Sequence, residues 1–273
     1  MPEPPRMTDT IALARNRKRA KGSDLILQKA AADEVQDRLL LVKKVFKSPA
    51  LVTPFASVWP QDILNHASIV QDEDIQPLRQ TAHDLVIHSL ALHWANDPVG
   101  QLIQCRRALT PDGLFIGFTL AGQTLHELRS SLAQAESEVV GGLSPRVAPM
   151  PEIRDLGALL QRAGFAMPVA DSVMIKTSYD NMWALTRDLR KMGESNALAG
   201  RLRHCTPPSV MKRAAQIYKT NYGTDDNRVT ATFELVVLTG WAPDESQPKP
   251  LRPGSAEARL ADVLKTSEVK LSD

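Results

Sequence analysis

The sequence predicts an α/β fold in which helices cover a mainly parallel β-sheet. Apolar runs typical of buried strands alternate with stretches of helical spacing from about residue 50 to residue 240, and this alternation builds parallel sheets. The run Leu85-Val86-Ile87 is continuously apolar, as strands that are covered on both faces are. A chain of 273 residues, 43% of them hydrophobic, is long enough for one large domain with appended segments.

The first 46 residues predict a helical arm. Residues 8–21 carry five arginines and lysines among small apolar residues, which indicates a short basic helix. Peripheral contact with a membrane surface is one role for such a helix, and a solvated helix face is the other. After a break at Gly22, residues 24–46 have the spacing of a long amphipathic helix that ends before Pro49.

Residues 47–242 predict the main domain, and residues 243–273 a polar tail with one weak helix at 255–265. The expected strands are residues 50–53, 68–70, 84–90, 114–120, 169–177 and 228–240. The expected helices are a turn or two within 58–66, then residues 98–109, 124–139, 153–163, 179–192 and 208–222. The stretch 179–222 is therefore a helical insertion before the last strand. The stretch 53–84 has room for about one strand–helix–strand unit, where a full nucleotide-binding half needs two.

Composition excludes several classes of protein. The formal net charge of +2 argues against a nucleic-acid partner. The apolar runs are too short for a transmembrane helix, which needs about 20 residues, and the first residues do not resemble a secretory signal. Cys105 and Cys205 form no Cys-x-x-Cys pair, so no metal site is predicted. We expect a cytoplasmic protein, or one of the mitochondrial matrix in a eukaryote.

Several long motifs resemble known families. Asp84-Leu85-Val86, Leu90 to Trp94, Leu109 to Gly113 and Thr124 to Arg129 are similar to the class I S-adenosylmethionine-dependent methyltransferases of the biotin-synthesis type, which methylate a malonyl carrier protein. Gly141 to Pro145, Met192 to Asn196 and Gly240-Trp241 are more similar to a sister branch, the complex I assembly factors. The resemblance covers roughly two thirds of the chain.

This resemblance implies a Rossmann-like sheet with a truncated N-terminal half, S-adenosylmethionine as cofactor, and a protein or carrier-protein substrate. In the assembly-factor branch it implies action on an arginine of an iron–sulfur subunit of respiratory complex I. The chemistry of that branch is hydroxylation rather than methylation.

The chain departs from the family where the cofactor loop belongs. The family has a glycine-rich turn after its first strand because the backbone must approach the cofactor closely, yet no glycine occurs here between Gly22 and Gly100. Two prolines occur there instead, together with Phe55 and Trp59. The sequence therefore predicts that the aromatic ring of Phe55 or Trp59 fills the adenosine volume. An alternative therefore stays open, namely a non-catalytic scaffold or assembly chaperone that has lost cofactor binding.

The candidate site residues follow the strands, because open α/β sheets bind ligands at the carboxyl ends of their strands. The candidates for cofactor binding are Thr53, Asp72, His88, Ser89 and Leu90. The candidates for substrate binding are His93, Trp94, Thr124, Glu127, Arg129, Glu194 and Asn196. No nucleophile or acid–base constellation stands out, so no catalytic residue is assigned.

Each of these substrate candidates has a functional and a structural interpretation. His93 could orient or deprotonate a substrate, and Trp94 could stack on a guanidinium or on adenine. Glu127 could pair with a cationic substrate, and Glu194 or Asn196 could face the pocket. The structural alternatives are a core tryptophan, a capping box formed by Thr124 and Glu127, and a plain helix end at residues 192–196.

Overall fold

The computed structural model describes residues 6–248 and residue 266. The chain divides into two compact units, residues 1–243 and 244–273, and every helix and strand given below belongs to the first. The weak helix predicted at 255–265 lies outside the described residues.

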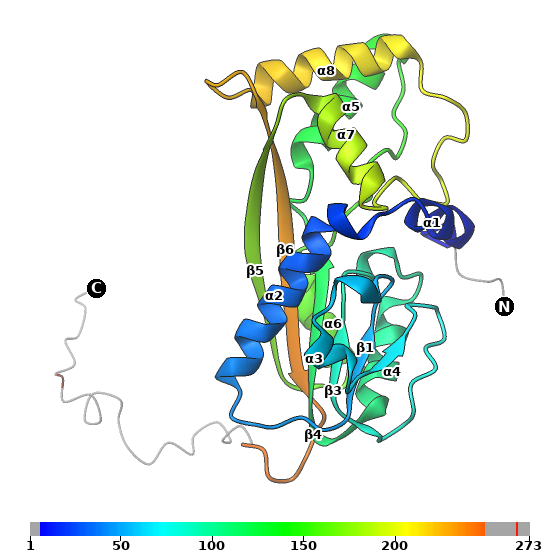
Figure 1. The fold of residues 1–273 in the computed structure, drawn as a ribbon. Helices are drawn as coiled ribbons and strands as arrows, with labels where there is room; N and C mark the ends of the chain where they lie inside the picture. The colour runs from blue at the N-terminus through cyan, green and yellow to red at the C-terminus, as the bar shows by residue number, and fades with distance from the viewer. Residues whose placement is uncertain (1–5, 249–265, 267–273) are drawn as a thin grey trace, which may run out of the picture. The chain divides into compact units, whose positions relative to one another are not determined.

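A six-stranded sheet forms the centre of the first unit, in the order β2-β1-β3-β4-β6-β5 (Figure 1). Its strands are β1 (Pro49–Val52), β2 (Ser68–Val70), β3 (His83–His88), β4 (Leu109–Leu120), β5 (Ala166–Tyr179) and β6 (Val229–Trp241). The pairs β1–β2, β1–β3 and β3–β4 are parallel, whereas β6 is antiparallel to both of its neighbours. The predicted α/β class with a mainly parallel sheet is confirmed.

Eight α-helices surround this sheet within the described residues. They are α1 (Thr10–Arg17), α2 (Ile26–Leu41), α3 (Gln61–Leu64), α4 (Pro98–Ala108), α5 (His126–Val140), α6 (Ile153–Ala163), α7 (Met182–Lys191) and α8 (Pro208–Tyr222). Helix α2 ends earlier than predicted, because the chain is already extended at Val42, and the amides of Lys47 and Ser48 then donate to the Asp84 carboxylate beside β3.

The two faces of the sheet bury separate clusters of apolar side chains. Along β3, Leu85 and Ile87 pack on one face with residues of α2, α5, α7 and α8, while Val86 packs on the other face with residues of α4 and α6. The same alternation holds along β1 and β4, since successive side chains of a strand point to opposite faces. Burial on both faces explains the continuous apolar runs of these strands.

The N-terminal half of the sheet is short. Between β1 and β2 the chain forms a 3-10 turn, Ala56–Val58, and the single-turn helix α3, and β2 then pairs directly with β1. This is the one strand–helix–strand unit that the spacing predicted. Helix α1 lies near the carboxyl ends of these strands (Figure 1), where its Asn16 side chain donates to the Ser195 carbonyl at 3.0 Å.

Candidate functional site

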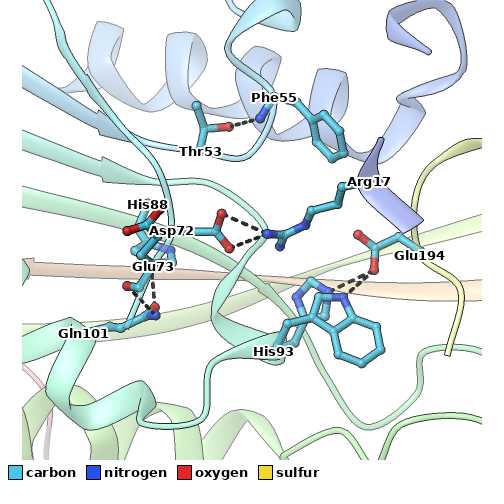
Figure 2. Close-up of polar contacts among 10 residues, drawn as sticks. Arg17, Thr53, Phe55, Asp72, Glu73, His88, His93, Gln101 and Glu194 are labelled. Atoms are coloured by element: carbon cyan, nitrogen blue, oxygen red, sulfur yellow. Dashed lines mark hydrogen bonds and ion pairs between the residues drawn. The ribbon is translucent and has the colours of Figure 1, made fainter. Parts of the chain in front are cut away.

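The centre of the candidate site is a cluster of three side chains, His93, Trp94 and Glu194. The chain leaves β3, adopts a positive φ of 42° at Leu90 and enters a 3-10 turn, Leu92–Trp94. This turn directs both rings at one carboxylate oxygen of Glu194 (Figure 2). Trp94 Nε1 donates to Glu194 Oε2 at 2.7 Å, and His93 Nε2 lies 3.2 Å from the same oxygen. The fold therefore brings together three predicted residues from segments about 100 positions apart.

The Glu194 carboxylate is held ionised in a mostly buried position. Its side chain is 13% exposed. Burial by itself raises the pKa of this carboxyl, but the hydrogen bonds and positive charge of its neighbours outweigh it and hold the pKa below its ordinary value. Because a carboxylate only accepts, His93 donates through Nε2. Both bonds use Oε2, and no described residue donates to Oε1.

An apolar cavity of about 210 Å³, here called the acceptor cavity, opens beside this cluster. Four of the predicted substrate residues line it: Trp94, Thr124, Glu194 and Asn196. Its remaining wall is mainly leucine, with Met150 and Phe233. Arg146 also lines it, but the Glu136 carboxylate neutralises that guanidinium at 2.6 Å. Glu194 therefore lies at the edge of an apolar cavity, and no arginine or lysine among the described residues pairs with it.

A second cavity of about 630 Å³, here called the strand-end cavity, lies at the carboxyl ends of β1 and β2. It is lined by Asp72, Glu73 and Asp74 after β2, by Phe55 after β1, and by residues of α1. Trp94 lines both cavities. The Trp94–Glu194 pair thus stands at the boundary between them, where a group could pass from one bound molecule to another.

Arg17 of α1 reaches into this region and pairs with Asp72 (Figure 2). Its Nη1 donates to both Asp72 oxygens, at 2.9 and 2.7 Å. Sequence reasoning missed Arg17, because the basic run 8–21 gave no sign of which cation turns inward. Asp72, the predicted acid at this strand end, follows β2, and its side chain is 7% exposed.

The prediction that Trp59 fills the adenosine volume is wrong, and for Phe55 it stays a prediction. Trp59 is 4% exposed and turns into the main apolar cluster, because the 3-10 turn before it closes with a hydrogen bond from the Trp59 amide to the Ala56 carbonyl. Phe55 lines the strand-end cavity.

The other cofactor candidates, Thr53, His88, Ser89 and Leu90, do not line this cavity. Thr53 is buried, and its hydroxyl accepts from the Phe55 amide at 3.1 Å. His88 Nε2 lies 3.1 Å from Gln101 Oε1, and burial lowers the pKa of this imidazole, so it stays neutral. Ser89 donates to the Gln28 side chain of α2 at 2.8 Å, which ties that helix to the end of β3.

The remaining substrate candidates have partners inside the fold. The buried Glu127 carboxylate accepts from the Thr232 hydroxyl at 2.5 Å, so it forms no capping box with Thr124. Thr124 instead hydrogen-bonds the backbone of Glu234, and Arg129 Nη2 donates to the Thr124 carbonyl at 3.1 Å. Asn196 donates to the Pro145 carbonyl at 2.8 Å and shapes the rim of the acceptor cavity.

Comparisons with known proteins agree with this architecture. A family model described as a methyltransferase domain matches residues 56–117. An arginine-hydroxylase of Danio rerio, mitochondrial NDUFAF5, is 42% identical over 202 residues, which cover 74% of this chain and 63% of that protein. A presumed methyltransferase of Rickettsia prowazekii is 30% identical, and the match covers 66% of this chain and 82% of that protein. The chain spans about three fifths of the length of the Danio relative.

Solved structures show the same fold. The crystal structure of a presumed methyltransferase from Bacillus halodurans superimposes with a TM-score of 0.50 at 11% identity, covering 77% of this chain and 99% of that one. The six-stranded sheet and the ligand-sized cavity at its strand ends define a class I methyltransferase-type protein. The chain belongs to the S-adenosylmethionine-dependent methyltransferase superfamily.

Proposed function

We propose that this protein binds S-adenosylmethionine and modifies an arginine side chain of a protein during the assembly of respiratory complex I. The similar proteins are named arginine-hydroxylases, which supports arginine as the modified residue. Their names also give a mitochondrial location, which supports a role in complex I assembly in an organelle or a bacterium. The iron–sulfur subunit that the sequence resemblance implies is the proposed partner. In the described part of the chain, no helix is both long and apolar enough to cross a membrane.

The observation that carries the proposal is the Glu194 carboxylate at the acceptor cavity. Ligand pockets for small molecules usually measure about 300–1,000 Å³. The acceptor cavity, at about 210 Å³, better suits one side chain. Its leucines suit the methylene stem of an arginine, and Glu194 Oε1, to which no described residue donates, can accept from the guanidinium. Trp94 adds an aromatic ring to the same wall, which favours a planar cation.

The strand-end cavity fits the cofactor in size and in chemistry. Its volume of about 630 Å³ lies within the range of ligand pockets, and Asp72 stands where an acid can accept from ribose hydroxyls. Phe55 offers a flat apolar surface for adenine. When bound, S-adenosylmethionine supplies a sulfonium centre. Trp94 and Glu194 orient the acceptor against it, and the leucines of the acceptor cavity exclude water.

A pair of matched probes tests the acceptor. N-acetyl-arginine amide and N-acetyl-citrulline amide have nearly the same shape, but only the first carries a charge. We expect ligand-observed NMR titration to show the arginine probe binding at least about tenfold more tightly, as expected for a hydrogen bond between charged groups. Glu194→Gln should remove this preference, and Glu138→Gln, at an exposed carboxylate elsewhere, should leave it unchanged. Equal binding of both probes by the unaltered protein would refute the assignment.

The product distinguishes the two chemistries of the superfamily branches. The protein is incubated with a complex I iron–sulfur subunit, S-adenosylmethionine, dioxygen and a reductant. Mass spectrometry of the arginine peptides should then show one added oxygen for hydroxylation, with dioxygen as the oxidant, or one added CH2 for methylation, with the methyl group taken from S-adenosylmethionine. An unmodified subunit in the presence of bound cofactor would contradict the proposed partner.

A further inference from the structure

The guanidinium of Arg17 uses only part of its hydrogen-bonding capacity. One nitrogen, Nη1, holds both oxygens of Asp72. The other two nitrogens, Nε and Nη2, are buried and have no hydrogen-bond partner among the residues that the structure describes. Buried donors of a charged group are costly to leave unpaired, so this edge of Arg17 indicates a missing ligand group.

The geometry of that edge selects the ligand group. Nε and Nη2 carry parallel N–H bonds on one side of the planar guanidinium, a fork that matches the two oxygens of a carboxylate. Arg17 lines the strand-end cavity, which Asp72, Glu73 and Asp74 also line. A ligand carboxylate next to these three acids needs a cation within a few ångströms, and Arg17 supplies it.

The turn after β1 lacks the amides that a glycine loop would offer. Within residues 53–59 the Thr53 amide donates to Val70, the Phe55 amide donates to Thr53, and Pro54 has no amide. The amides of Val58 and Trp59 close the 3-10 turn. At most the amides of Ala56 and Ser57 remain, too few for the cradle that a glycine-rich turn builds around a ligand.

We infer that Arg17 binds the amino-acid carboxylate of the cofactor and so replaces the donors of the missing glycine loop. This inference rests on the proposed function, since it assigns a residue to the same cofactor. Its donor comes from helix α1, which Gly193 positions: a Cβ at Gly193 would lie 3.2 Å from the Arg17 Cα.

The test compares two ligands that differ in the group Arg17 is assigned to hold. S-adenosylhomocysteine carries the amino-acid carboxylate, and 5′-methylthioadenosine lacks the whole amino-acid end. By isothermal titration calorimetry, Arg17→Met should weaken S-adenosylhomocysteine by about 10- to 100-fold, the cost of a hydrogen-bonded ion pair, and should change 5′-methylthioadenosine by less than about threefold. Arg15→Met is the matched control, because Arg15 is an exposed cation of the same helix.

A second variant guards against a folding defect. Arg17→Lys keeps a cation opposite Asp72 but loses the fork, so it should weaken S-adenosylhomocysteine selectively and to a smaller extent. Equal weakening of both ligands by Arg17→Met and Arg17→Lys would overturn the inference and leave the proposed function standing. Binding of neither ligand by the unaltered protein would overturn both.

Discussion

Glu194 is the residue on which the site depends. It accepts from both rings of the His93–Trp94 pair through one oxygen, and its side chain lines the acceptor cavity. Its neighbours keep it ionised in spite of burial. A buried carboxylate with a lowered pKa stabilises the folded state only while it is charged, which makes its contribution dependent on pH.

The sign of that dependence follows from the direction of the pKa shift. The folded-state pKa lies below the unfolded value of about 4.3, so the stabilisation is complete above about pH 5 and is lost as the pH falls through the folded pKa. At pH 6.5, Glu194→Gln should lower the free energy of unfolding by about 1–3 kcal/mol, the range for hydrogen bonds to a charged group. The difference should shrink below pH 4.

Urea denaturation at pH 6.5 and at pH 3.5 measures this difference. Glu138→Gln is the control, since Glu138 pairs with Arg213 on an exposed surface. The same destabilisation by Glu194→Gln at both pH values would mean that the Glu194 charge contributes nothing to stability.

At the scale of elements, the site depends on the contact between the end of α7 and helix α1. Gly193 follows α7 with φ of 81°, a conformation that disfavours any residue with a Cβ. The same glycine packs closely on α1 and on Phe55, with 3.4 Å from its virtual Cβ to Phe55 Cζ. Gly193 therefore sets both the direction of residues 194–196 and the position of Arg17.

Substitution of this glycine separates the two effects. Gly193→Ala and Gly141→Ala should each lower the free energy of unfolding by about 1–2 kcal/mol, because both glycines have a left-handed backbone conformation that strains alanine. Gly193→Ala should cost more, because a Cβ at Gly141 meets nothing within 4 Å. Thermal unfolding measures the costs, and tryptic cleavage within residues 8–21 should be faster for Gly193→Ala, since α1 is displaced. Equal costs and equal cleavage would show that the contact with α1 contributes nothing.

At the scale of the whole molecule, more of the fold than of the candidate site could be predicted from the sequence. Strands alternating with helices and the continuous apolar runs predicted the sheet, and the motifs at residues 84–129 and 192–196 predicted the superfamily. His93, Trp94 and Glu194 were each predicted as substrate candidates, but their contact with one another was not predicted. Arg17 could not be predicted, because its partner Asp72 lies 55 residues away and no local pattern marks that pair. The orientation of Trp59 was missed for the same reason: tertiary packing decides it.

We propose that the cofactor site survives without a glycine loop because α1 and the strand-end cavity take its place. Calorimetric titration of the protein with S-adenosylmethionine tests this claim most directly. The account predicts one site of micromolar affinity, which corresponds to about −8 kcal/mol. The absence of binding up to millimolar concentration would contradict it and would favour a scaffold that keeps the fold without the cofactor.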